Sequence, residues 1–128
     1  MSGAIGTAIV LREPLSLWGG MDPATGTVVD VRHPQRGARL SGRVVVMPSA
    51  RGSSSSASVL VEAVRAGTAP AAIVLGEPDL ILAIGPAVAE ELYGVSVPIV
   101  VDAAGILSAI SDGAEVRIGP DGELEVGP

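Results

Sequence analysis

The segment whose residue types point most clearly to chemistry is a serine-rich loop at residues 51–58. It reads Arg-Gly-Ser-Ser-Ser-Ser-Ala-Ser, between a β-branched run and an amphipathic pattern of helical period. Backbone N–H groups gather at the start of a helix beside the positive end of its dipole, and such a site favours a carboxylate or a phosphate. Gly52 would let a ligand approach the backbone, and the Arg51 guanidinium can grip an anion. A serine hydroxyl there lies where a developing alkoxide would be stabilised.

The same loop also has a purely structural interpretation. Serine is a preferred N-cap residue, and four serines in a row suit an exposed loop tip. The loop is neither a P-loop, because Gly-x4-Gly-Lys-Ser/Thr is absent, nor a nucleophile elbow, because Gly-x-Ser-x-Gly is absent. His33 is the only histidine, and no further motif supports a Ser-His-Asp triad built on it. From the residues alone, the structural and the anion-binding interpretations are both open.

Other notable residues favour structural roles by their context. Asp22 could hydrogen-bond a substrate or a partner, but it precedes a proline, where an Asx-turn is typical. His33 could line a cleft, but it precedes a proline in a loop, as a surface or structural histidine would. Glu62 lies in the predicted helix away from its apolar side, which is the position of a solvated carboxylate. Trp18, beside two glycines, suits either an interface anchor or an ordinary core residue.

Strands and helices in alternation are expected to position the serine loop. Residues 43–47 form a continuous β-branched run stopped by Pro48, which is typical of a buried strand. Strands are also expected at residues 6–12, 27–31 and 71–75, with further apolar runs at residues 80–84 and 98–101. Residues 115–118 and 123–126 alternate around a Gly-Pro-Asp-Gly turn, which predicts a hairpin.

Three helices are expected. In the one after the serine loop, Ala57, Leu60, Val61 and Val64 share one face, and Gly67 is a plausible stop. Pro86 can open a second helix that runs through residues 87–93 and ends at Gly94. Asp102 can cap a third helix over residues 103–111 that stops near Gly113.

These elements predict an α/β fold in one domain over residues 1–128. The second half is expected to build a parallel sheet covered by helices, with a β layer from the first half packed against it. Hydrophobic residues make up 48% and aromatic residues 2%, so the core must consist of Val, Ile, Leu and Ala. A net charge of −6 and the absence of a basic run argue against nucleic acid and against an anionic membrane surface as partners.

Cysteine usage restricts the cofactors that this chain itself can hold. It has no cysteine and one histidine, so it can supply no thiolate ligand to a metal or an iron–sulfur cluster, and we expect no metal site on it. The N-terminus lacks the pattern of a signal peptide, and no apolar run approaches the roughly 20 residues that span a bilayer. The expected location is the cytoplasm.

Several short motifs occur at characteristic spacing over roughly residues 15–101. They are Gly19-Gly20, Asp22-Pro23, Thr25-Gly26, Asp30, His33-Pro34, Gly37, Arg51-Gly52-Ser53-Ser54, Glu62, Ala69-Pro70-Ala71-Ala72-Ile73, Asp79, Gly85, Ala89-Glu90-Glu91-Leu92-Tyr93-Gly94 and Val97-Pro98. Each fragment alone is weak, but the combination is specific, and it resembles the small subunit of the aconitase X family.

The resemblance implies a fold, a partner and a reaction. The fold would be the swivelling β/β/α three-layer domain that resembles the C-terminal domain of aconitase. The partner would be a large subunit in a heterodimer, and its cysteines would hold a 4Fe-4S cluster. The reaction would be the dehydration of a hydroxy acid, with mevalonate 5-phosphate going to trans-anhydromevalonate 5-phosphate in an archaeal-type mevalonate pathway. The alternative substrate in this family is cis-3-hydroxy-L-proline.

The resemblance also assigns the loop residues. Ser53, the first serine after the glycine, matches the serine that abstracts a proton in the Gly-Ser-Ser-Arg motif of aconitase. The aconitase arginine has Ser55 in its place here, so its role in binding the substrate carboxylate cannot be carried over. Arg51 is the substitute, and Gly52, Ser54 and Ser55 complete the expected substrate-binding set.

Two functions of other classes compete with this assignment. The chain could be a non-catalytic anion-binding or regulatory domain that docks on an enzyme. It could also be a phosphohistidine-type swivelling carrier, although that function needs an exposed histidine in a Gly- or Thr-rich loop, and His33 before Pro34 fits poorly.

Overall fold

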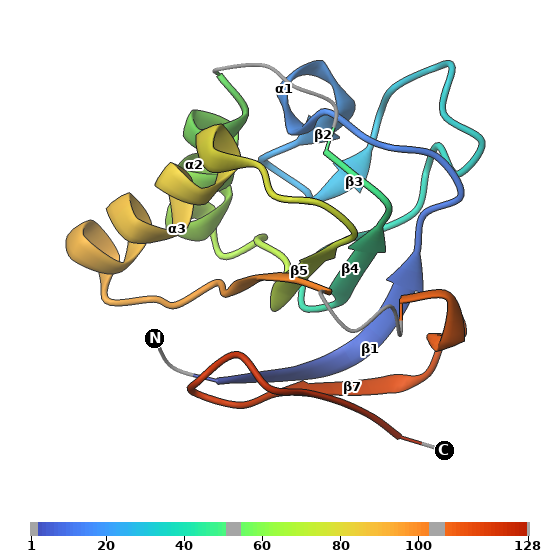
Figure 1. Ribbon diagram of the computed structural model, residues 1–128. Coiled ribbons are helices and arrows are strands. Elements are labelled where there is room, and N and C mark those ends of the chain that lie inside the picture. The colour runs from blue at the N-terminus through green and yellow to red at the C-terminus, as the bar shows by residue number, and fades with distance from the viewer. Residues whose placement is uncertain (1–2, 51–54, 103–106, 128) are drawn as a thin grey trace.

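A computed structural model describes residues 3–50, 55–102 and 107–127 of the chain (Figure 1). The strands are β1 (Ala4–Val10), β2 (Met21–Asp22), β3 (Thr27–Val28), β4 (Val44–Met47), β5 (Ala72–Leu75), β6 (Ile99–Val101), β7 (Glu115–Ile118) and β8 (Leu124–Val126). The helical elements are α1 (Leu17–Gly20), α2 (Ser56–Ala66), α3 (Leu80–Tyr93) and the 3-10 turn η1 (Leu107–Ala109).

Six of the strands form one mixed sheet in the order β6-β5-β4-β1-β7-β8. Strands β1, β4, β5 and β6 are parallel, and β7 and β8 are antiparallel to their neighbours. The first half of the chain therefore contributes β1 and β4 to the main sheet itself. Of the strands in the described ranges, only the β2–β3 pair lies apart from it, so the predicted separate β layer is reduced to two short strands.

Strands β4 and β5 are buried on both faces, as the continuous apolar runs predicted. Alternate side chains enter two cores, because successive residues of a strand point to opposite faces. Val45 and Ile73 pack on the side of α2 and α3, whereas Val44 and Val74 pack on the side of Ile110. Among the described residues, the buried hydrophobic side chains are aliphatic or methionine, which confirms the prediction of an aliphatic core.

Helix α2 follows β4 and ends as predicted. Gly67 lies at its C-cap with a φ of 77°, a left-handed conformation that glycine adopts without steric penalty. The buried face consists of Ser56, Leu60, Ala63 and Val64. It is rotated from the predicted face, because Ala57 and Val61 turn toward α3 and are only half-buried.

Helix α3 begins at Leu80, so the prediction that Pro86 opens it was wrong. The Asp79 side chain accepts a hydrogen bond from the Leu82 N–H (2.9 Å) and caps the helix. Pro86 lies inside α3 and removes one backbone donor there. The buried residues of α3 are Leu82, Gly85 and Ala89. They pack toward α2 and fix α3 against it.

The remaining elements agree with the prediction in part. The β7–β8 hairpin is confirmed, with Ile118 paired to Leu124. Strand β3 is shorter than predicted. Of the helix predicted over residues 103–111, residues 103–106 lie outside the described part, and the described remainder holds only the turn η1, where the Asp102 carboxylate accepts the Leu107 N–H. Within the described ranges, no helix combines the length and apolar character needed to cross a membrane.

Candidate functional site

The serine loop joins β4 to α2, at the edge where the parallel strands of the sheet end. Arg51, Gly52, Ser53 and Ser54 lie outside the described residues, so their predicted roles stay predictions. Ser55 and both flanks of the loop are described. The site is therefore defined by the frame that holds the two ends of the loop.

Ser55 occupies the N-cap position of α2, but its side chain makes no capping hydrogen bond to the helix. Its backbone has a φ of −82° and a ψ of −9°, which is helical, whereas a serine that caps a helix usually has an extended backbone. Ordinary capping therefore does not account for the serine at this position.

Ser56, the next residue, anchors the downstream end of the loop. It is 5% exposed, and its Oγ accepts a hydrogen bond from the Trp18 N–H (3.3 Å). The same oxygen lies 3.3 Å from the Ser16 Oγ, with which it shares a second hydrogen bond. The first turn of α2 is thus attached to the segment before and within α1.

Ala50 anchors the upstream end of the loop to the same segment. It forms a parallel β-bridge with Leu15, which is 1% exposed. Both ends of the loop are therefore held by residues 15–18. Figure 1 shows α1 beside the start of α2.

A close backbone contact supports the loop from the neighbouring β5–α3 connection. The Gly76 N–H donates to the Pro48 oxygen (3.0 Å) and to the Met47 oxygen (3.3 Å). A Cβ atom at Gly76 would lie 2.7 Å from the Pro48 oxygen, closer than real Cβ atoms come. Glycine is required here because the two loops touch through their backbones.

This frame presents the N-terminus of an eleven-residue helix at the end of a parallel sheet. The first N–H groups of a helix have no partner within it, and the helix dipole adds partial positive charge. Ligands of open α/β sheets bind outside the carboxyl ends of the strands. The arrangement suits binding of an anionic group.

The buried polar residue Ser56 was missed in the sequence as part of the frame. A signal was present, because Ser56 shares a helical face with Leu60 and Ala63. Its partners could not be identified from sequence, since Ser16 and Trp18 lie far away along the chain.

We expect Ser56→Ala to lower the free energy of unfolding by about 1–2 kcal/mol relative to Ser58→Ala. Both changes replace serine by the better helix former alanine on the same helix, so the propensity gain cancels. Only the first leaves the Trp18 N–H without its acceptor. Urea unfolding of the two variants measures the difference, and equal stability would contradict the anchoring role of Ser56.

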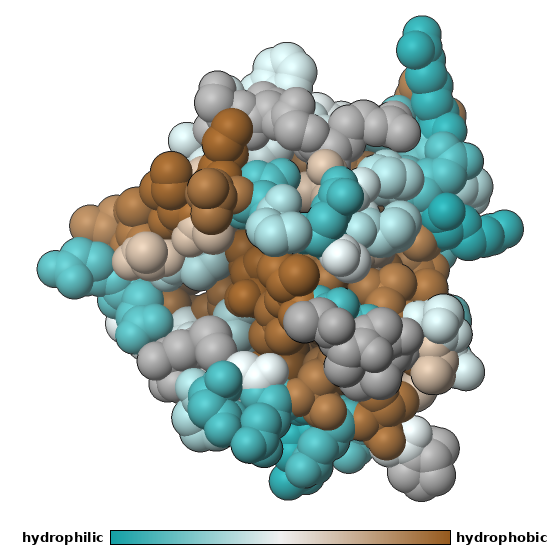
Figure 2. All heavy atoms as spheres, in the orientation of Figure 1, coloured by the Kyte–Doolittle hydropathy of each residue, from teal (hydrophilic) through white to brown (hydrophobic). Residues whose placement is uncertain are grey.

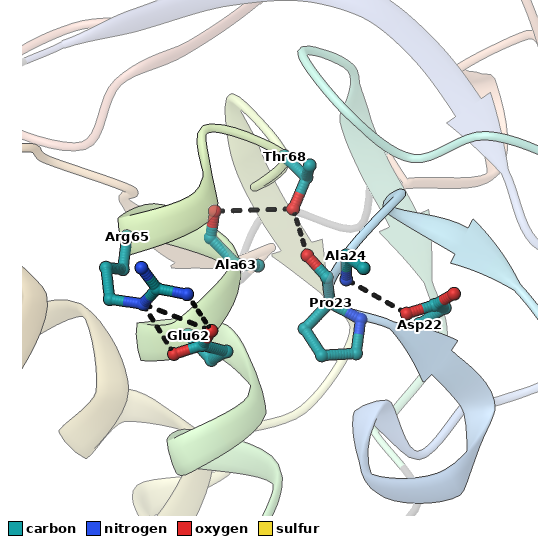
Figure 3. A network of polar contacts seen from close by, with 7 residues as sticks. All are labelled: Asp22, Pro23, Ala24, Glu62, Ala63, Arg65 and Thr68. Atoms are coloured by element: carbon teal, nitrogen blue, oxygen red, sulfur yellow. Dashed lines mark hydrogen bonds and ion pairs between the residues drawn. The ribbon is translucent and has the colours of Figure 1, made fainter.

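Glu62 is a solvated carboxylate, as predicted, and it is paired with Arg65 on the surface of α2 (Figure 3). The side-chain hydrogen bond from Arg65 lowers the pKa of the Glu62 carboxyl, and the same bond raises the pKa of the Arg65 guanidinium. Glu62 is therefore held ionised and paired, so it is not a proton donor at neutral pH.

Asp22 makes the Asx-turn that its context predicted. Its Oδ1 accepts the Ala24 N–H (2.9 Å), and Figure 3 shows this turn beside the end of α2. The Thr68 hydroxyl, just beyond α2, donates to the Pro23 oxygen (2.6 Å). The motif around Asp22 thus supports the helix that follows the serine loop and places no carboxylate in the site.

His33 is structural, which was one of its two predicted roles. It is 6% exposed, and both ring nitrogens are engaged, Nε2 with the Glu13 oxygen (3.0 Å) and Nδ1 with the Gln35 N–H (3.1 Å). A backbone N–H can only donate, so Nδ1 accepts and Nε2 carries the proton. Among the residues that the structure describes, the ring has no serine or aspartate partner, and it is buried, which argues against both the triad and the phosphohistidine carrier.

Trp18 is 59% exposed, so it is not the core residue that was one of its two interpretations. The dihedral angles of Trp18 (φ −70°, ψ 119°) and Gly19 (φ 76°, ψ −11°) make α1 a tight turn rather than a regular helix. The turn places the indole on the surface next to the frame. Its role as an interface anchor stays a prediction.

The residues of this chain do not fit an iron–sulfur cluster. The sequence has no cysteine. Over the described ranges, no group of three or more His, Asp or Glu side chains is placed to hold a metal ion. Any cluster that takes part in the chemistry would have to be bound by cysteines outside these 128 residues.

Comparison with known proteins connects this frame to one family. The sequence model of the aconitase X swivel domain matches residues 2–126. The crystal structure of Thermococcus kodakaraensis aconitase X in its holo-form superposes with a TM-score of 0.85 at 34% identity, covering 99% of this chain and 92% of that chain. The expected swivelling α/β fold is thereby confirmed.

Two kinds of curated relative are similar in sequence. The phosphomevalonate dehydratase small subunit of Methanopyrus kandleri is 38% identical over 119 residues, which cover 92% of this chain and 84% of that protein. The cis-3-hydroxy-L-proline dehydratase of Pseudomonas aeruginosa is 50% identical over 96 residues, which cover 75% of this chain. The chain spans only 17% of the length of that second relative.

Proposed function

Because the chain belongs to the aconitase X swivel domain family, we propose that it is the small subunit of a two-chain hydro-lyase that dehydrates a hydroxy acid. The observation that carries this proposal is the family match along almost the whole chain, which includes the serine loop. The described frame supports it, since it holds both ends of the loop at the carboxyl edge of the sheet. As part of the same proposal, residues 1–128 form one swivelling domain.

The substrate that we propose is mevalonate 5-phosphate, which would lose water to give trans-anhydromevalonate 5-phosphate. The support is coverage, because the phosphomevalonate dehydratase small subunits align with nearly all of this chain. Such a substrate carries both a carboxylate and a phosphate, the groups that a helix N-terminus favours. A phosphorylated acid does not cross membranes unaided, so we place the complex in the cytoplasm.

A second candidate substrate is cis-3-hydroxy-L-proline. The higher identity to the Pseudomonas aeruginosa enzyme over the aligned residues favours it. Fold does not decide between the two substrates, because function depends on the residues of the site. A non-catalytic anion-binding domain is the remaining alternative. In that case, turnover by the partner enzyme would not depend on the residues of the serine loop.

In the proposed reaction, Ser53 removes the proton from the carbon next to the substrate carboxylate. The C–H bond breaks as its proton passes to the Ser53 Oγ, its electrons form the new double bond, and the C–O bond breaks so that the hydroxyl leaves as hydroxide. Transfer of the proton from Ser53 to this hydroxide through solvent gives water and restores the alkoxide. A serine alkoxide is a strong base that water would protonate, so it needs stabilisation by nearby donors. Arg51 and the N–H groups of Gly52, Ser54 and Ser55 are the donors that we assign to this role.

The partner that we propose is a large subunit whose cysteines hold a 4Fe-4S cluster, in a heterodimer with this chain. When bound, such a cluster supplies a Lewis acid that assists departure of the substrate hydroxyl. This chain contributes the serine loop, and its own task is to position the base and to bind the anionic part of the substrate.

The assay that tests this proposal compares the two substrates on the same complex. The two chains are co-expressed and purified under anaerobic conditions, and turnover is followed with mevalonate 5-phosphate and with cis-3-hydroxy-L-proline. We expect kcat/KM for the phosphorylated substrate to exceed that for the proline by at least about 100-fold, as is typical when a site built for one polar group meets a substrate without it. The reverse preference would assign the chain to the hydroxyproline enzymes, and no turnover of either would contradict the dehydratase function.

A further inference from the structure

The outer face of α3 is apolar although it faces solvent. Leu80, Ile84, Val88 and Leu92 follow one another at intervals of four residues, which places them on one side of the helix. They are 82%, 57%, 38% and 61% exposed, respectively. We call these four residues the α3 stripe. Figure 2 shows the corresponding hydrophobic surface over α3, at the left of the view.

A surface helix normally carries charged residues on its outer side. In α3, no charged residue occurs between Leu80 and Ala89. The apolar surface is therefore contiguous, and contiguous exposed apolar patches mark sites of interaction more often than scattered residues do.

A groove between α2 and α3 extends the stripe toward the serine loop. It is lined by Ala57, Ser58, Val61 and Glu62 of α2 and by Ile84, Gly85 and Val88 of α3, so Glu62 is its one charged residue among those described and the rest is mostly apolar. Gly85 brings the helices close, since a Cβ atom there would lie only 3.1 Å from the Ala57 oxygen. The apolar surface thus runs from the stripe to the first turns of the helix that follows the loop.

The stripe also begins at the same edge of the sheet as the serine loop. Helix α2 follows β4 and α3 follows β5, and these two strands are parallel neighbours. Both helices therefore start at the edge where the strands end. Leu80, the first residue of α3, lies at the loop end of the stripe.

We propose that the α3 stripe is the surface on which the large subunit docks. This inference rests on the proposed function, in which a second chain must meet the serine loop to complete the site. The stripe and the groove adjoin the first turns of α2, which directly follow that loop in the chain, so a chain that reaches the loop can cover them in the same contact.

The charges around the stripe argue for a different chain rather than a second copy of this one. Glu77 and Asp79 lie before its first residue, and Glu90 and Glu91 are exposed near its end. The whole chain carries a net charge of −6. Two copies would bring acidic rims together, whereas a partner with an apolar surface and a basic rim would be complementary.

The test measures association between the two chains and not only turnover. Sedimentation velocity and isothermal titration calorimetry, under anaerobic conditions, give the Kd of the large subunit encoded in the same genome for each variant of this chain. We expect Leu80→Glu and Ile84→Glu each to raise Kd at least about 30-fold, the scale of losing an interface hot spot. Val126→Glu is the matched control, because Val126 is 37% exposed on β8, the edge strand at the opposite end of the sheet from β6, and it should change Kd less than about twofold.

Folding and function are separated by two further readouts. A carboxylate at Leu80 lies in the first turn of α3, where the helix dipole favours it, so the thermal unfolding of Leu80→Glu should match the wild type. At saturating large subunit, the kcat of both stripe variants should return to the wild-type value, because docking and chemistry are separate.

The possible outcomes distinguish this inference from the proposed function. A wild-type complex whose Kd is insensitive to both stripe variants would overturn the docking surface alone. A wild-type chain that dimerises through the stripe by itself would assign the surface to a second copy and overturn the choice of partner. The absence of any complex between the wild-type chains would remove the proposed function, and this inference with it.

Discussion

Ser53→Ala is expected to lower kcat for dehydration at least about 100-fold, the scale of losing a group that transfers a proton. Alanine removes the Oγ that accepts the proton and leaves the frame of the loop in place, because the frame depends on Ala50 and Ser56. The Kd for the large subunit should stay unchanged. Steady-state kinetics of the anaerobic complex measures the first effect, and titration calorimetry measures the second.

The matched control for this prediction is Ser111→Ala, at an exposed serine on the turn that precedes β7. It makes the same chemical change away from the serine loop, and kcat should remain within about twofold of the wild type. A complex in which Ser53→Ala keeps full turnover would remove the base assignment. The chain would then have a docking or anion-binding role, the alternative that the sequence left open.

Gly26→Ala is expected to have the largest effect on stability, a loss of about 2–4 kcal/mol in the free energy of unfolding. The residue has a φ of 74°, which disfavours any side chain. A Cβ atom there would also lie 2.0 Å from the Ser41 Oγ and 2.7 Å from the Thr68 oxygen. The hydroxyl cannot turn away freely, because it donates to that same Thr68 oxygen (2.7 Å).

Gly42→Ala separates the two causes of this loss. Gly42 has a φ of 71°, close to that of Gly26, but no atom lies within 4 Å of the position of its Cβ. It should cost only the backbone strain, about 1–2 kcal/mol. Urea unfolding of both variants gives the difference, and equal losses would show that the contact with Ser41 and Thr68 is not as tight as described.

The contact at Gly26 explains part of a motif that the sequence could connect to function only by resemblance. Asp22, Pro23 and Gly26 form a turn that is bonded to Thr68, directly after α2. The turn therefore fixes the C-terminal end of α2, the helix that follows the serine loop. The Asx-turn of Asp22 could be predicted from its own neighbours, but its contact with Thr68 depends on the tertiary fold.

Local sequence patterns correctly predicted the buried strands and the C-terminal ends of α2 and α3. Strand β4 was recognisable because a strand covered on both faces is apolar throughout, and Gly67 because a left-handed C-cap requires glycine. The start of α3 was missed because a short apolar run at residues 80–84 fits a strand and a helix equally well. Asp79 is the residue that decides for a helix, through its bond to the Leu82 N–H.

The candidate site could be located in sequence but not built from it. The serine loop was recognisable by composition and by its place before a helix. The residues that anchor the loop could not be recognised in the sequence. Leu15, Ser16 and Trp18 contact its two ends, at Ala50 and Ser56, only in the folded chain. The exposure of the α3 stripe could not be predicted either. In a sequence, an apolar residue that enters the core cannot be distinguished from one that lies on the surface.

We propose that this chain supplies an essential half of a dehydratase site. The most direct measurement is a titration of this chain into a fixed amount of the anaerobically purified large subunit, with turnover of mevalonate 5-phosphate as the readout. We expect no turnover above background from either chain alone, and a rise to a plateau as the two chains reach equivalence. Full turnover by the large subunit without this chain would contradict the claim.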